Sequence, residues 1–130
     1  MIRPKYESPP KPTKAQSRAA YEAVTERSGG VCEGCSVGSG SQRHHRVFRS
    51  HGGTETIANL LVLCLTCHQQ AHTPIGYQRG WAVYSHNDPE MVPTFNTRNR
   101  TWSRQGEPID AQSAVEYMQA VGQIRTGMVT

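Results

Sequence analysis

The chain has 130 residues, of which 35% are hydrophobic, and a net charge of +4 with a pI near 9.1. This length suits one domain, and the low hydrophobic content predicts a small core that needs an additional cross-link such as a bound metal. No apolar run approaches the roughly 18 residues of a membrane span, and the first residues do not resemble a secretory signal, so we expect neither membrane insertion nor export. The basic balance favours a polyanionic partner.

Residues 1–13 are rich in proline and contain two of the three lysines, which predicts an extended basic arm. A helix is predicted over residues 15–27, because this segment lacks Gly and Pro, Thr13 can act as the N-cap, and Gly29 follows the end. Its thin apolar stripe consists of Ala20, Tyr21 and Val24. We expect this stripe to pack on a core and the opposite face to be solvated.

The centre of the chain is predicted to hold strands and a helix around its cysteines. Residues 31–35 are expected to form a short strand that leads into the first cysteine pair. Residues 42–49 predict a polar strand whose side chains face a site, because they offer little to a core. The apolar run at 60–63 predicts a buried strand, and residues 64–73 predict a short helix that ends before Pro74.

The C-terminal part is richer in aromatic and β-branched residues. Strands are predicted at 81–84, 92–95 and 99–102, and a last helix at 111–124 with Asp110 as its N-cap. The predicted organisation is an arm, a core and an extension that packs on it: residues 1–13, 14–75 and 76–130.

Two CxxC pairs, Cys32 with Cys35 and Cys64 with Cys67, are separated by 28 residues. Zinc prefers four tetrahedral ligands and binds thiolates tightly, and a two-residue gap lets both sulfurs of a pair reach one ion. Because nothing indicates export, a metal site is favoured over disulfides. Four thiolates leave no open coordination position, so this zinc is predicted to be structural and to support the small core.

Five of the six histidines lie between positions 44 and 72. On a helix, His68 and His72 are one turn apart and differ by about 40° in direction, so they can bind one ion together. Cys67 and His68 differ by about 100°, so the helix should present sulfur to one site and nitrogen to another. An open site of two or three histidines plus water suits metal-assisted hydrolysis.

The adjacent pair His44 and His45 comes from the polar strand, where side chains alternate in direction. One of them can be a third metal ligand. The other, with an unperturbed pKa near neutrality, can act as a general base if the strand ends or is distorted there. Spacing does not decide which histidine has which role. His51 and His86 are expected to be ordinary surface or core histidines.

This pattern resembles the HNH endonuclease family and its ββα-metal motif. Asn59 follows His45 by fourteen residues, and His68 follows Asn59 by nine. The two CxxC pairs are similar to those of zinc-bearing members, and the segment at 80–93 is similar to HNH proteins of bacteriophages and actinobacteria. The resemblance implies an α+β fold: a small ββα-metal core with a four-cysteine zinc site, flanked by an N-terminal helix and by C-terminal strands and a helix.

The resemblance also implies roles. His45 would be the general base that activates water, and Asn59 would brace the loop that orients it. The metal ligands would be His44, His68 and His72. Three imidazoles favour a transition metal, and Mg²⁺, Mn²⁺, Ni²⁺ and Zn²⁺ all stay open. An arginine near the histidine pair could clamp the phosphate, and Arg46 is the first choice because of its adjacency.

The implied activity is hydrolysis of phosphodiester bonds in double-stranded DNA with one catalytic metal, by nicking or double-strand cleavage, leaving a 5′-phosphate and a 3′-hydroxyl. The family resemblance further suggests a bacteriophage protein in the cytoplasm of its host, with a role in genome packaging, alongside phage packaging proteins, or as a mobile endonuclease. The alternative is a catalytically inactive, zinc-stabilised DNA-binding or packaging adaptor.

Overall fold

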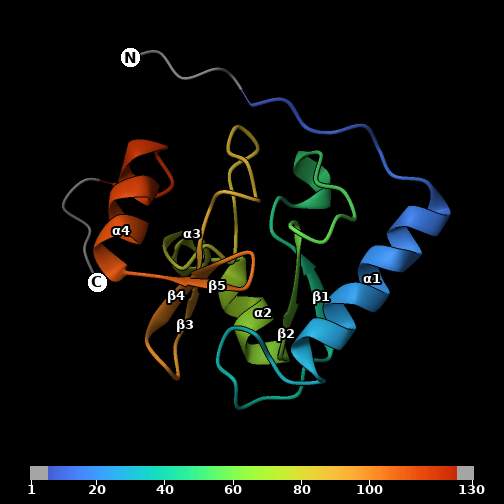
Figure 1. Ribbon diagram of the computed structural model, residues 1–130, viewed down its shortest axis with the longest axis horizontal. Coiled ribbons are helices and arrows are strands. Elements are labelled where there is room, and N and C mark those ends of the chain that lie inside the picture. The colour runs from blue at the N-terminus through green and yellow to red at the C-terminus, as the bar shows by residue number, and fades with distance from the viewer. Residues whose placement is uncertain (1–5, 126–130) are drawn as a thin grey trace.

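A computed structural model describes residues 6–125, so the part of the predicted arm at 1–5 lies outside the described residues. Small sheets and helices alternate along the chain, which confirms the predicted α+β class (Figure 1). The order is α1 (Lys14–Ser28), β1 (Gln42–His45), the 3₁₀ turn η1 (Arg49–His51), β2 (Leu60–Leu63), α2 (Leu65–Ala71), α3 (Pro74–Gln78), β3 (Thr94–Asn96), β4 (Thr101–Arg104), β5 (Glu107–Ile109) and α4 (Ala111–Ala120). No helix of the described part is long and apolar enough to cross a membrane.

Helix α1 forms where local signals predict it. Thr13 and Gln16 make a reciprocal capping box at its start, and Gly29 ends it in the left-handed conformation with a φ of 63°. Ala20 and Val24 are buried against β2, while most of the remaining helix surface is exposed. The predicted helix and its apolar stripe are therefore confirmed.

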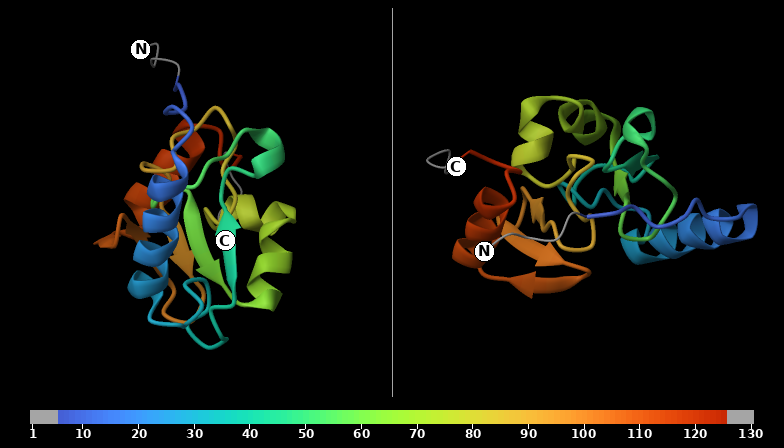
Figure 2. Two further views of the ribbon diagram at one scale, coloured as in Figure 1. Left: turned by 90° about the vertical axis from the view of Figure 1, so that its right-hand side faces the viewer. Right: turned by 90° about the horizontal axis from the view of Figure 1, so that it is seen from above.

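Strands β1 and β2 pair antiparallel, with His44 opposite Leu61 and His45 opposite Leu60. All four residues of β2 are buried because helices cover both of its faces: Leu60 and Val62 pack against α1, while Leu61 and Leu63 pack towards α2. Figure 2 shows the two strands between these helices. This double cover explains why β2 is an uninterrupted apolar run.

The C-terminal extension differs in detail from the expectation. The predicted strand at 81–84 is wrong: these residues have no regular secondary structure, although the first three are almost fully buried. Pro74 does not simply end a helix, because it occupies the first turn of α3. Strands β3 and β4 confirm two predicted strands with shifted bounds, β5 was missed, and α4 ends at Ala120 rather than 124. Residues 31–35 form a single bridge, Val31 with Ser39, instead of a strand.

Arg46 joins the core to this extension. Its side chain is buried, with the residue 4% exposed, and the guanidinium donates to four backbone carbonyls: Gly80, Ala58, Pro89 and Val92 at 2.9, 3.0, 2.7 and 2.6 Å. The prediction that Arg46 clamps the substrate phosphate is therefore wrong. The hydrogen-bonding capacity of this side chain is used to hold the backbone of 80–92 against β1.

We expect Arg46→Met to lower the free energy of unfolding by at least about 3 kcal/mol, because several buried carbonyls lose a charged donor. Urea denaturation in zinc-replete buffer measures this effect. Arg98→Met, at an exposed position, is the matched control and should stay within about 0.5 kcal/mol of the parent. Equal stability of the two variants would contradict the structural role of Arg46.

Candidate functional site

The four cysteines converge on one point. Their sulfur atoms all lie within 4.8 Å of one another, and the Cys35 and Cys64 sulfurs are 3.9 Å apart. Four sulfurs at about 2.3 Å from a tetrahedral zinc are about 3.8 Å from each other, so the cluster has the dimensions of a zinc site. All four thiols are free of disulfides. The cluster could hold a structural zinc, as the CxxC spacing predicts.

The loops around the cysteines are shaped for sulfur ligands. Backbone N–H groups of Gly34, Gly38 and Cys67 donate to Cys32, Cys35 and Cys64 at 3.3, 3.4 and 3.4 Å. Such bonds favour the thiolate, and although burial opposes them they lower the pKa of Cys35 to about 7. Gly38 also approaches Cys64 so closely that an added Cβ would lie 2.6 Å from the Cys64 Cβ. Gly34 makes room for the ring of Trp81, because an added Cβ there would lie 2.7 Å from Cζ2 of that ring.

Three histidines form a second cluster. The ligand nitrogens of His44, His68 and His72 lie within 4.8 Å of one another, and the Nε2 atoms of His68 and His72 are 3.3 Å apart. Helix α2 supplies His68 and is capped by His72, while the register of β1 turns His44 towards the same side as Leu61. The residues present therefore fit one divalent metal, and they are the same three that the sequence suggested.

The neighbours of His44 fix its tautomer. Its Nε2 lies 2.7 Å from the carbonyl oxygen of Trp81, which can only accept, so Nε2 carries the proton and Nδ1 keeps its lone pair. Burial, together with the nearby His68 and His72, lowers the pKa of His44 to about 3. Burial likewise lowers the pKa of His68. Neutral imidazoles with oriented lone pairs are what a metal requires, and a carbonyl behind a ligand is a common orienting contact.

His45 lies beside this cluster and is not a member of it. Its partners are Arg49, whose Nε donates to His45 Nε2 at 3.3 Å, and Glu55, whose carboxylate lies 3.8 Å from the same nitrogen. Burial, with a further contribution from Arg49, lowers the pKa of His45 despite the opposing effect of Glu55. The side chain is therefore neutral at neutral pH and its Nε2 is an acceptor, which is the state a general base needs.

Asn59 ties together both ends of the loop between β1 and β2. Its Oδ1 accepts from the Val47 N–H at 2.8 Å, and its Nδ2 donates to the carbonyls of Val47 and Thr54 at 3.2 and 3.0 Å. The residue is 3% exposed, and its own carbonyl accepts from the Arg46 N–H. These contacts hold the two ends of the loop between β1 and β2 together.

One open pocket of about 300 Å³ brings the two sets of groups together. Its lining consists of Arg43, His44, His45, Phe48, Arg49, Ser50, His68 and His72. Phe48 stacks on His72 with ring centroids 4.6 Å apart, and the Glu55 carboxylate lies next to His45.

The sequence did not predict the roles of Phe48, Glu55 and the Trp81 carbonyl in this site, because none of them belongs to a spaced motif. Of the three arginines near the histidine pair, Arg43 and Arg49 line the pocket and Arg46 does not.

The comparison with protein families identifies this arrangement. Residues 32–73 match the family model of the HNH endonucleases, and the match includes both cysteine pairs and the three-histidine cluster. These residues form an HNH domain. Searches of curated proteins and of solved structures gave no significant match. The HNH domain indicates a nuclease that acts on nucleic acid, and its four-cysteine cluster agrees with the zinc-bearing type.

Gly38→Ala tests the sulfur site without removing a ligand. The added Cβ would collide with Cys64 and disturb the N–H that supports Cys35, so zinc affinity should fall roughly 10-fold or more. Competition with a chromogenic chelator measures the affinity. Ser41→Ala, an exposed position in the same loop, is the control and should bind zinc like the parent. An unchanged affinity for Gly38→Ala would argue against a metal at the sulfurs.

The two clusters should also be separable by metal counting. We expect the parent loaded with Mn²⁺ or Ni²⁺ to hold one zinc and a second ion, and the double variant His68→Ala with His72→Ala to keep the zinc and lose the second ion. Elemental analysis after desalting gives both numbers. The matched control, His51→Ala with His86→Ala, removes two imidazoles outside the cluster and should retain both ions. Loss of zinc from the first pair, or a retained second ion, would contradict two independent sites.

Proposed function

We propose that this protein is a metal-dependent endonuclease that hydrolyses phosphodiester bonds in double-stranded DNA. The observation that carries the proposal is that one open pocket holds both His45, whose pKa is lowered, and a separate cluster of three histidines that could hold a metal. A protein that only binds DNA has no need of a water-activating base. The match to the HNH endonuclease family supports the same conclusion.

In this proposal His45 is the general base. Its Nε2 lone pair, which accepts from Arg49 in the absence of substrate, would take a proton from the attacking water. Arg49 is suited to bind the scissile phosphate, because its side chain is 68% exposed and lies at the pocket. When Arg49 turns towards the phosphate, the lone pair of His45 becomes free for water. Asn59 would hold the loop that positions both residues.

A divalent metal held by His44, His68 and His72 would stabilise charge on the phosphate and on the departing 3′-oxygen. The Trp81 carbonyl keeps the Nδ1 of His44 available for this ion. The products would be a 5′-phosphate and a 3′-hydroxyl. The ions to be compared are Mg²⁺, Mn²⁺, Ni²⁺ and Zn²⁺, and three imidazoles favour the transition metals among them. A bacteriophage origin, a packaging or mobile-element role and a place in the host cytoplasm rest on sequence resemblance and stay predictions.

His45→Ala is the decisive variant. We expect it to fold, bind DNA and hold both metals, but to cleave supercoiled plasmid 10²- to 10⁴-fold more slowly, roughly the contribution of a positioned base. The assay follows nicked and linear products in each of the four metals. His51→Ala, which removes an exposed histidine that does not line the pocket, should cut at the rate of the parent.

Two results would overturn parts of this proposal. If His45→Ala cuts as fast as the parent, another group is the base. If the parent cuts in none of the metals while binding DNA and a second ion, the HNH domain serves as an inactive DNA-binding or packaging adaptor.

A further inference from the structure

A large groove on the described surface lies beside the proposed catalytic pocket. It has a volume of about 800 Å³ and runs along α1, with Arg43 shared between the groove and the pocket. In the proposed mechanism the scissile phosphate occupies the pocket, and nothing is assigned to the groove. The groove therefore raises the question of what extends from the pocket along α1.

One face of α1 turns towards the pocket. Lys14, Arg18, Tyr21 and Thr25 are spaced by four, three and four residues, which puts them on one side of a helix, and all four line the groove. Arg43 donates to the Thr25 hydroxyl at 3.0 Å, and Arg49 lies 3.4 Å from the Tyr21 hydroxyl. Two arginines of the pocket thus contact this face of α1 directly, and the groove is continuous with the site.

Charge is distributed unevenly along the groove. Its N-terminal end carries Lys11, Lys14 and Arg18, all exposed, whereas Glu22 and Glu26 lie nearer the C-terminal end of α1. From Tyr21, beside Arg49, to Lys14 is seven residues, or about 10 Å along the helix axis. Successive phosphates of one DNA strand rise about 3.4 Å, so this row spans roughly three nucleotides.

We propose that the groove face of α1 docks the backbone of duplex DNA flanking the cleavage site, with Lys14 and Arg18 binding phosphates that the pocket does not contact. Charge complementarity identifies the occupant: the end of the groove at the N-terminus of α1 is cationic, and the hydroxyl groups of Tyr21 and Thr25 can also donate to phosphate. The groove offers few large apolar side chains to a protein partner. This inference rests on the proposed function, because it takes the duplex to be the substrate.

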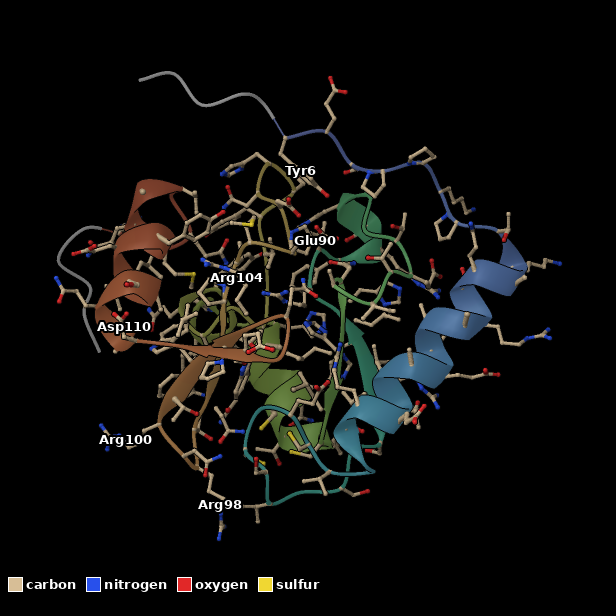
Figure 3. All side chains as sticks on the ribbon, viewed as in Figure 1. Tyr6, Glu90, Arg98, Arg100, Arg104 and Asp110 are labelled. Atoms are coloured by element: carbon tan, nitrogen blue, oxygen red, sulfur yellow. The ribbon has the colours of Figure 1, made fainter. Side chains whose placement is uncertain are left out.

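The test compares two charge-matched double variants in a His45→Ala background, where the duplex stays intact. Lys14→Gln with Arg18→Gln removes two cations from the groove, and Arg98→Gln with Arg100→Gln removes two from the turn between β3 and β4, on the side away from α1 (Figure 3). Fluorescence anisotropy with a labelled short duplex gives the slope of log K against log salt. The groove variant should lower the slope by about 1.8, or about 0.9 for each phosphate, and weaken binding roughly tenfold or more in about 0.1 M salt.

The remote variant should keep nearly the parent slope and affinity. The opposite change, Glu22→Gln with Glu26→Gln, should tighten binding, because it removes repulsion from the same groove. Equal losses from the groove and remote variants would mean that only net charge matters and would overturn the proposal, as would a groove variant that binds like the parent.

Plasmid cleavage by the protein with His45 intact is measured in parallel and separates the two proposals. If the protein cleaves the plasmid but DNA binding does not change when Lys14 and Arg18 are replaced, the docking surface is refuted and the nuclease proposal stands. Binding that depends on these residues, without cleavage in any metal, refutes the nuclease and leaves the surface as the DNA-binding face of an adaptor.

Discussion

The register of β1 on β2 is the constraint on which the histidine cluster and the pocket depend. Alternation turns successive side chains to opposite faces, and β2 is buried on both faces, so a slip by one residue would exchange every core contact. With His44 opposite Leu61 and His45 opposite Leu60, the two histidines must diverge. His44 points to the side of α2 and its imidazoles, and His45 points to the side of α1. Sheet geometry thus places His44 with the imidazoles of His68 and His72 and leaves His45 outside that cluster, which agrees with the roles proposed for the two residues.

Helix α2 and Trp81 then couple the two clusters. The helix has only seven residues, yet it carries Cys67 towards the sulfurs and His68 towards the imidazoles. The indole of Trp81 packs into the cluster of buried residues around Cys32, while its carbonyl orients His44. Trp81 lies outside the segment that matches the family, at 32–73. The extension is therefore part of the site, because Trp81 contacts both the cysteine cluster and the histidine cluster.

The sequence predicted the features that depend on neighbouring residues. It was less informative about features that depend on contacts between distant parts of the chain. The CxxC pairs, the helical spacing of His68 and His72 and the caps of α1 each concern neighbouring residues, and all were predicted. The strand expected at 81–84 failed because its backbone finds partners elsewhere: the N–H of Trp81 donates to Gly76, and that of Val83 to Arg46. The β-propensity of aromatic and β-branched residues reflects how well their side chains pack on buried surfaces. The residues at 81–83 are buried in this way, but they do not pair with a strand.

Arg46 shows how the same alternation could have corrected an error. It was chosen as the phosphate clamp because it follows His45, but it lies two residues from His44 and so belongs to the face that turns inward. The carbonyls of 80–92 close over that face. Arg43 and His45, two residues apart on the other face, contact groups on the α1 side instead. In the proposed mechanism, a phosphate bound at His45 would therefore also lie near the groove along α1, because Arg43 lines both the pocket and that groove.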